Sequence, residues 1–181
     1  PEEVRALVER IVDGTLGATF GTDQPTPSTD AKVTVAIAGD HGGWRMKDAI
    51  GAWLGEHGYA VEDCGTDSDE AVDYPDYARR VAELVADGSC RWGIVVDGAG
   101  IGSAMAANKV PGVRAANCHD ISSARNSREH NYANVLTLGA GFLGTALALQ
   151  IVSTGLDTEW GAERHGRRVD KISRIEQGYA K

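Results

Sequence analysis

The chain has 181 residues, 42% of them hydrophobic and 24% charged, which is the composition of a globular protein with one well-buried domain. Eighteen basic and 26 acidic residues give a formal net charge of −8, and this acidic balance argues against nonspecific binding to nucleic acid. No apolar run reaches the roughly 20 residues that span a bilayer, and no signal-peptide pattern opens the sequence, so we expect a cytoplasmic protein that does not bind membranes.

The first 16 residues carry an apolar stripe. Its members recur at helical spacing: Val4, Leu7, Val8, Ile11 and Val12. This spacing is typical of an amphipathic helix, and the Gly-, Thr- and Pro-rich residues 17–32 predict a flexible linker after it. The leader over residues 1–16 resembles the encapsulation peptides that direct enzymes into bacterial microcompartments, where it would bind a shell or cargo protein. The alternative is a helix that packs on its own domain or on a dimer partner.

Residues 33–181 form one predicted domain in which strands and helices alternate. Apolar segments predict strands at residues 33–40, 59–65, 92–97, 113–118 and 134–139. Helical patterns lie at residues 42–58, 74–88, 103–110, 120–130, 144–154 and 164–177. The alternation predicts an α/β fold, with an open parallel sheet covered by helices on both faces and ligands bound at the carboxyl ends of the strands. The cysteines, Cys64, Cys90 and Cys118, lack metal-ligand spacing and are expected to be free thiols.

The first predicted strand ends at Asp40 and His41, which are followed by two glycines. Asp40 taken alone could be a helix N-cap. His41 can hydrogen-bond or carry a proton near neutral pH, so the two adjacent side chains together are a better candidate for a site than either one singly.

The third predicted strand ends at Asp97, which opens a turn with glycines at Gly98, Gly100 and Gly102. Backbone N–H groups of such a turn can converge on an anion at a helix N-terminus. The turn lacks the dinucleotide fingerprint and the Lys-Ser/Thr of a P-loop, which argues against a dehydrogenase. Asp97 itself could be a structural cap, or a base held against a ligand in the crevice.

Two later segments also concentrate polar residues. His130 and Asn131 follow an Arg-Glu pair, and Arg164 and Arg168 lie four residues apart at the start of the last predicted helix. Arginines at that spacing share one helix face and can bind a phosphate from one side. The alternative is a solvated basic turn.

Read together, these segments resemble the ribose-5-phosphate isomerase B family, which includes the galactose-6-phosphate isomerase subunits. The matching motifs occur in order between residue 33 and about residue 172: AGDHGG, VEDCGT, VDYPDYA, GAGIG, AANKVPGVRAA, CHDISSAR, REHNYAN and RHGRRVDKI. The resemblance implies a Rossmann-like domain, a homodimer or tetramer with sites shared between subunits, and no metal or organic cofactor. It also implies an aldose–ketose isomerase of the pentose phosphate pathway, which removes a proton at C2 and passes through a cis-enediolate.

The resemblance also implies roles for individual residues. His130 would assist ring opening, Asp40 would hold the sugar oxygens, and Tyr74 would line the pocket. The implied phosphate ligands are His41, Arg164 and Arg168. The implied donors to the enediolate are Gly98, Gly100, Gly102 and Asn131, because negative charge moves onto oxygen as the proton leaves carbon.

The chain departs from the family around the glycine turn. Asp97 stands where many members have a cysteine base, Ala99 stands where they have threonine, and Ser103 stands where another branch has a glutamate base. An aspartate is already ionised at neutral pH, whereas a thiol needs activation. We therefore predict that Asp97 is the base.

A second departure lies at Gly141, where family members commonly have an arginine that reaches the phosphate. The loss of this contact favours a weaker phosphate grip or a substrate of another size, such as a tetrose phosphate. Ribose 5-phosphate is the default substrate. A noncatalytic sugar-phosphate binder is the remaining alternative, and the presence of His130 and Asp40 argues against it.

Overall fold

The computed structural model describes residues 32–179. The predicted leader over residues 1–16, and the predicted linker over residues 17–32 except for Lys32, lie outside the described residues. The described part belongs to a single compact unit of the chain. No helix within residues 32–179 is both long enough and apolar enough to cross a membrane.

One parallel sheet forms the centre of the domain. Its strands are β1 (Thr34–Gly39), β2 (Ala60–Asp63), β3 (Trp92–Asp97), β4 (Ala115–Asn117) and β5 (Val135–Gly139), in the order β2-β1-β3-β5-β4. The helices are α2 (Trp44–Glu56), α3 (Tyr74–Ala86), α4 (Ile101–Ala107), α5 (Ile121–Asn131), α6 (Thr145–Asp157) and α7 (Glu163–Tyr179). The predicted α/β fold is confirmed, and each predicted boundary within the domain differs from the observed one by a few residues only.

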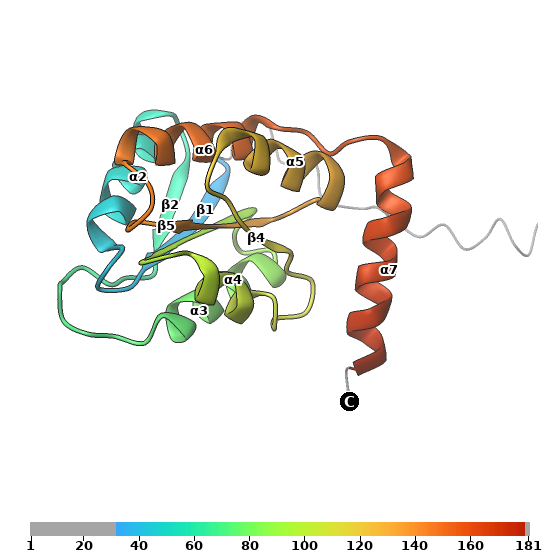
Figure 1. Cartoon of the computed structure of the whole chain (residues 1–181), viewed down its shortest axis with the longest axis horizontal. Coiled ribbons are helices and arrows are strands. Elements are labelled where there is room, and N and C mark those ends of the chain that lie inside the picture. The colour runs from blue at the N-terminus through green and yellow to red at the C-terminus, as the bar shows by residue number, and fades with distance from the viewer. Residues whose placement is uncertain (1–31, 180–181) are drawn as a thin grey trace, which may run out of the picture. The chain divides into compact units, whose positions relative to one another are not determined.

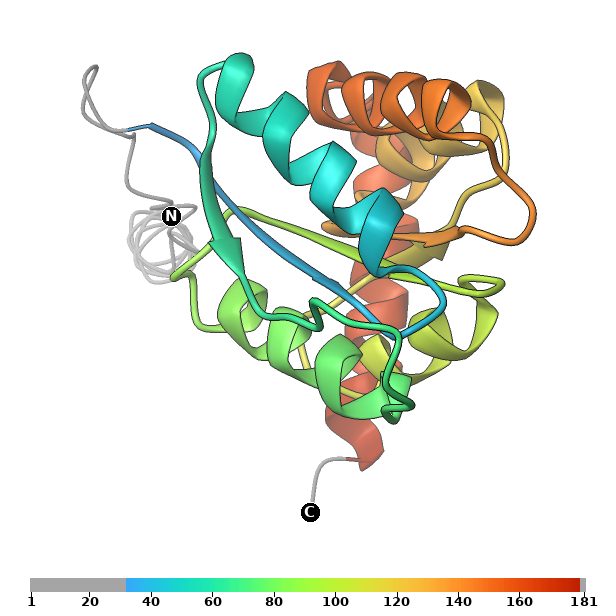
Figure 2. The same cartoon turned by 90° about the vertical axis from the view of Figure 1, so that its left-hand side faces the viewer.

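Helices cover both faces of the sheet. Helices α2, α5 and α6 lie on one face and α3 and α4 on the other (Figures 1 and 2). Each face has its own apolar core, built around Ile37 and Leu136 on the first face and around Val95 and Val135 on the second. Because the central strands are buried from both sides, β3 is apolar along nearly its whole length. Helix α7 packs against α5 at the end of the domain far from α2 (Figure 1).

The strand order places a topological switch point between β1 and β3. The chain leaves β1 toward β2 on one side and then returns to β3 on the other side. Ligands of open α/β sheets bind in the crevice outside the carboxyl ends of the strands at such a point. Asp40 and Asp97 lie at these two carboxyl ends, so the fold places the two predicted carboxylates beside the crevice.

The turn after β1 lies directly against the end of β3. A Cβ at Gly43 would lie 2.0 Å from the carbonyl oxygen of Val96, a backbone atom that cannot swing aside. We expect Gly43→Ala to lower the free energy of unfolding by about 3 kcal/mol, as measured by urea denaturation. The matched control is Gly51→Ala within α2, which has open space around it and should gain about 0.5–1 kcal/mol. Equal stabilities for the Gly43 variant and the wild type would contradict this close approach.

The described cysteines are free thiols, as predicted. Cys90 and Cys118 are buried, and Cys64 is partly buried. Burial raises the pKa of each thiol, which keeps all three protonated and poorly reactive at neutral pH.

Candidate active site

Asp40 occupies the turn between β1 and α2. Its backbone N–H donates to the carbonyl of Val96 at 3.1 Å, and its Oδ1 accepts from the N–H of Gly42 at 2.8 Å. The N-cap of α2 is Gly43, which makes no side-chain capping bond. The alternative interpretation of Asp40 as the helix cap is therefore wrong. No donor within residues 32–179 is bonded to Oδ2 of Asp40, so this oxygen can accept a hydrogen bond from a ligand.

His41 follows Asp40 and is exposed. Its Nδ1 accepts from the N–H of Val72 at 3.3 Å, which ties the turn to the loop before α3. His41 also lines a cavity of about 300 Å³ together with Arg45, Ala140 and other residues from the start of α2 and the β5–α6 turn. The predicted phosphate ligand thus lies beside an open cavity next to Asp40.

The side chain of Asp97 is turned into the glycine turn. It is 5% exposed, and its Oδ1 accepts from the N–H groups of Ala99, at 2.7 Å, and of Gly100. Its Oδ2 accepts from the N–H of Ser103 at 3.2 Å and from the hydroxyl of Ser103. Both carboxylate oxygens are therefore held by donors of this turn and of the first turn of α4. Asp97 closes the turn as a structural cap does.

One of the donors predicted for the enediolate has a partner within the turn. The N–H of Gly100 donates to Asp97 in this structure. The reason is electrostatic, because an aspartate brings its own negative charge to the donors of the turn. The N–H of Gly98, in contrast, has no acceptor within the described part of the chain, and open space lies on the side where a Cβ would be.

Asp40, His41, Asp97 and the glycine turn form a first group of predicted site residues, and Tyr74 and Gly102 also belong to it. A Cβ built at Gly42 would lie 3.7 Å from the nitrogen of Gly98, so the turns that follow β1 and β3 are neighbours. A Cβ at Gly102 would lie 2.5 Å from Cζ of Tyr74, so the tyrosine ring covers Gly102. The fold therefore brings together, at the carboxyl ends of β1 and β3, Asp40, Tyr74, Asp97 and the glycine turn.

Gly141 packs closely against the same turn. Its N–H donates to the carbonyl of Gly98 at 2.9 Å, and a Cβ at Gly141 would lie 2.8 Å from that oxygen. Any larger residue at position 141 would have to push the backbone of the two turns apart. The glycine therefore does more than omit an arginine, because it permits a closer contact between the β5–α6 turn and the glycine turn.

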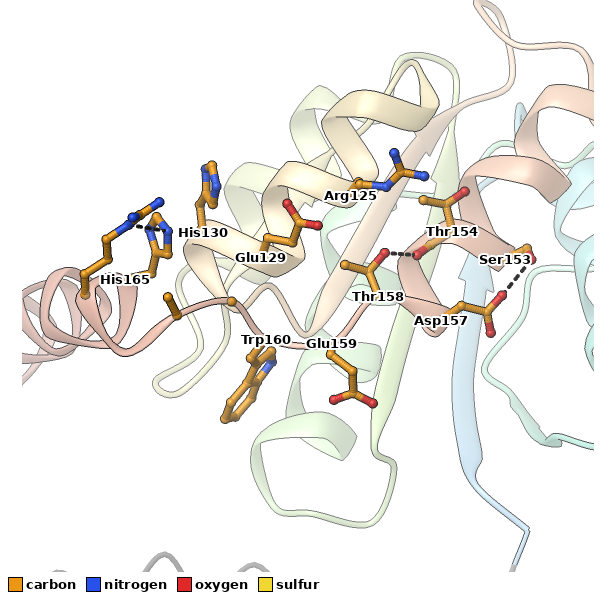
Figure 3. A pocket seen from close by; sticks show the side chains of 13 residues that line it. Arg125, Glu129, His130, Ser153, Thr154, Asp157, Thr158, Glu159, Trp160 and His165 are labelled. Atoms are coloured by element: carbon orange, nitrogen blue, oxygen red, sulfur yellow. Dashed lines mark hydrogen bonds between the residues drawn. The ribbon is translucent and has the colours of Figure 1, made fainter.

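A second group of predicted residues lines a different cavity, of about 700 Å³, formed by α5, the end of α6 and the start of α7 (Figure 3). His130 and Arg164 belong to its lining, with Arg125 and Glu129 beside them. Nδ1 of His130 lies 2.9 Å from Nδ2 of Asn126, which fixes the orientation of the ring.

His165 belongs to this second group and was not singled out from the sequence. It is 5% exposed, and its ring stacks on His130 with 4.2 Å between the ring centroids and 14° between the planes. Nε of Arg164 donates to its Nε2 at 3.2 Å, whereas its buried Nδ1 has no hydrogen-bond partner within residues 32–179. Its place between two arginines in Arg164-His165-Gly166-Arg167 was the only signal in the sequence.

The two groups are apart within one chain. Neither Asp40 nor Asp97 lines the cavity of the second group. Helix α7, which carries Arg164 and Arg168, stands at the opposite end of the domain from the start of α2 (Figure 1). Asn131, the last residue of α5, accompanies His130. The fold of one chain thus does not bring His130, Asn131, Arg164 and Arg168 to Asp97.

The surroundings of His165 predict a pH-dependent stability. Burial, and then the charges of His130, Arg164 and Arg168, lower the pKa of His165 below its usual 6.5. The unfolded chain therefore binds a proton there more readily, and stability falls as the pH drops below about 6.5. We expect the melting temperature to fall between about pH 7.5 and about pH 5.5, and to fall less in His165→Asn. Identical pH slopes for both proteins would contradict this assignment.

The arrangement at the sheet edge suits proton transfer next to an anion. Within the described residues, no group of three or more His, Cys, Asp or Glu side chains is placed to hold a metal ion. Three groups at the carboxyl ends of β1 and β3 supply the chemistry. They are the Asp40 carboxylate, which has one oxygen bonded and one free, the buried carboxylate of Asp97, and the free N–H of Gly98. Such a set can hold a polyhydroxy ligand and move a proton beside a developing oxyanion.

Comparison with known proteins identifies the family. The model of the family described as Ribose/Galactose Isomerase matches residues 35–172. Ribose-5-phosphate isomerase B of Escherichia coli is 44% identical over 143 residues, which are 79% of this chain and 96% of that protein. D-erythrulose-4-phosphate isomerase of Pectobacterium atrosepticum is 38% identical over 145 residues, or 80% of this chain and 95% of that protein.

Solved structures agree with this comparison. The structure of ribose-5-phosphate isomerase B from Clostridium thermocellum superposes with a TM-score of 0.81 at 49% sequence identity, covering 82% of this chain and 100% of that one. The matched region contains both groups of predicted site residues. This chain belongs to the ribose/galactose isomerase family of sugar-phosphate isomerases.

Proposed function

We propose that this sugar-phosphate isomerase interconverts an aldose phosphate and a ketose phosphate through a cis-enediolate, with Asp97 as the base. The observation that carries the proposal is the position of Asp97, at the carboxyl end of β3 and beside the topological switch point. Asp40 lies across the crevice with one oxygen free to hold the sugar hydroxyls. The reaction needs no redox partner, because one proton moves from one carbon to its neighbour.

Asp97 acts first as a carboxylate that accepts a proton and then as a carboxylic acid that returns it. Asp97 takes the hydrogen at C2 as a proton, the C–H electron pair forms the C1–C2 double bond, and the carbonyl electron pair moves onto O1. The O2 hydroxyl then passes its proton to O1. Asp97 returns its own proton to C1, which leaves the carbonyl at C2.

The donors around Asp97 fit this sequence of charges. Asp97 becomes neutral at the moment when negative charge appears on O1, so its hold on the N–H groups of Ala99 and Gly100 weakens. These donors can then turn toward the enediolate and join the free N–H of Gly98. Hydrogen-bond donors thus stabilise the negative charge on Asp97 before the proton transfer and the negative charge on O1 after it.

The second group of residues would reach the substrate from another copy of the chain. Within one subunit, Asp97 lies away from His130, Asn131, Arg164 and Arg168. The ring-opening acid and the phosphate ligands must nevertheless reach the same sugar as the base. A homodimer satisfies this requirement if α5 and α7 of one subunit face the carboxyl ends of β1 and β3 in its partner. Arg164 and Arg168 would then bind the phosphate, and His130 would assist ring opening.

Ribose 5-phosphate is the proposed substrate, because the relatives from Escherichia coli and Clostridium thermocellum are named ribose-5-phosphate isomerase B. A four-carbon sugar phosphate is the second candidate. Gly141 favours it, since the tight contact with Gly98 leaves no room for another phosphate-binding side chain. The Pectobacterium relative is named for such a sugar.

A panel of sugar phosphates tests the proposal. We expect ribose 5-phosphate to be isomerised, and the ratio of its kcat/KM to that of erythrose 4-phosphate decides between the two substrates. Binding of a sugar phosphate without turnover of any four-, five- or six-carbon member would instead identify a noncatalytic binder.

The leader over residues 1–16 is proposed to dock the cytoplasmic enzyme on a shell or cargo protein of a bacterial microcompartment. Its apolar stripe and the Pro/Thr-rich residues 17–32 support this role. We expect a chain lacking residues 1–32 to keep its kcat and its dimer, and to lose co-purification with shell proteins in a microcompartment-forming host. A large loss of active dimer would favour a leader that packs on the enzyme itself.

A further inference from the structure

Among residues 32–179, Ser103 is the one residue that holds Asp97 through both its backbone and its side chain. It lies in the first turn of α4, and its side chain is fully buried. Its hydroxyl donates to Oδ2 of Asp97, and its N–H donates to the same oxygen at 3.2 Å. The other oxygen, Oδ1, is bonded to Ala99 and Gly100 instead. The two oxygens of the carboxylate therefore have separate sets of donors.

We propose that Ser103 is a positioning residue for the base of the isomerase. The inference rests on the proposed role of Asp97 and adds a second residue to it. Because Ser103 is fully buried, it cannot touch the sugar and can act only through the carboxylate. Its hydroxyl anchors Oδ2, so that Asp97 keeps one orientation while Oδ1 exchanges its donors and its proton.

The hydroxyl also fixes the rotation of the carboxylate. The N–H of Ser103 donates to Oδ2 at 3.2 Å, and the hydroxyl is a second donor to the same oxygen. Without the hydroxyl, Oδ2 would keep one donor only, and the carboxylate could rotate away from the orientation in which it meets the C2 hydrogen.

The test compares the kinetics of Ser103→Ala and wild type. We expect kcat to fall about tenfold and KM to change less than about twofold, because the hydroxyl orients the base and does not touch the sugar. Ser103→Thr restores the hydroxyl and should recover most of the kcat. The matched control is Thr137→Val, which removes a fully buried hydroxyl that has no partner within residues 32–179. This control should leave kcat and KM unchanged.

A spectroscopic readout separates this inference from the proposed function. In protein labelled with ¹³C at aspartate carboxyls, the Asp97 signal is the one lost in Asp97→Asn. We expect its chemical shift to change in Ser103→Ala and to return toward the wild-type value in Ser103→Thr, whether or not a substrate has been found. An unchanged Asp97 signal together with unchanged kcat would overturn the role of Ser103 and leave the isomerase intact. Full turnover by Asp97→Asn would overturn the base itself.

Discussion

Asp97→Asn should lower kcat by about 10³-fold, with little change in substrate affinity. An amide cannot accept the proton from C2, and general base catalysis contributes roughly 10²- to 10⁴-fold to such reactions. The substituted side chain also carries two hydrogen-bond donors, whereas the N–H groups of Ala99 and Gly100 need an acceptor. A coupled isomerase assay measures the loss of turnover, and calorimetric titration with the substrate measures affinity.

The matched control for this substitution is Asp87→Asn. Asp87 is an exposed aspartate whose Oδ1 also accepts a backbone N–H, that of Ser89 at 2.8 Å. It lies beyond the end of α3, away from the glycine turn, so its substitution should leave kcat unchanged. If Asp97→Asn kept most of the wild-type turnover, Asp97 would be a structural cap only, and the role of base would have to be reassigned.

Mixing two inactive variants should restore activity. An Asp97→Asn subunit retains His130, and a His130→Asn subunit retains Asp97. If each site takes its base from one subunit and its histidine from the other, a mixed dimer contains one intact site. Random association of equal amounts then gives about a quarter of the wild-type activity, because about half of the dimers are mixed and half of their sites are intact.

The controls are each variant unfolded and refolded alone, which should stay inactive. Size-exclusion chromatography of the refolded mixture must show the same oligomer as the wild type. A mixture no more active than its two components would mean that both residues serve a site within one subunit. That result would contradict the division of the site between α5 and α7 of one subunit and the sheet edge of the other.

The fold could be read from the sequence because its signals are local. Apolar strands alternate with amphipathic helices, and Gly58 and Gly88 adopt positive φ where the sequence needs a stop after a helix. A buried parallel sheet requires apolar residues on both faces, so β3 stands out without any knowledge of its neighbours. The polar ends of β1 and β3 could then be placed at one edge from the rules for parallel sheets alone.

The hydrogen bonding of the site could not be read in the same way. The carboxylate of Asp97 could point into the crevice or into its own turn, and spacing alone does not decide between these orientations. The bond from Ser103 depends on the exact start of α4, which was predicted at residue 103 and begins at Ile101. The stacking of His165 on His130 joins α7 to α5 across a connection that has no sequence signature.

Hydrogen exchange at C2 tests the central claim most directly. Wild-type enzyme in deuterated water should exchange the C2 hydrogen of its aldose phosphate and place solvent deuterium at C1 of the ketose product, as followed by proton NMR. Asp97→Asn saturated with the same sugar should leave the C2 signal unchanged over the same time. Loss of that signal in Asp97→Asn at the wild-type rate would show that another group removes the proton, and the proposed mechanism would be wrong.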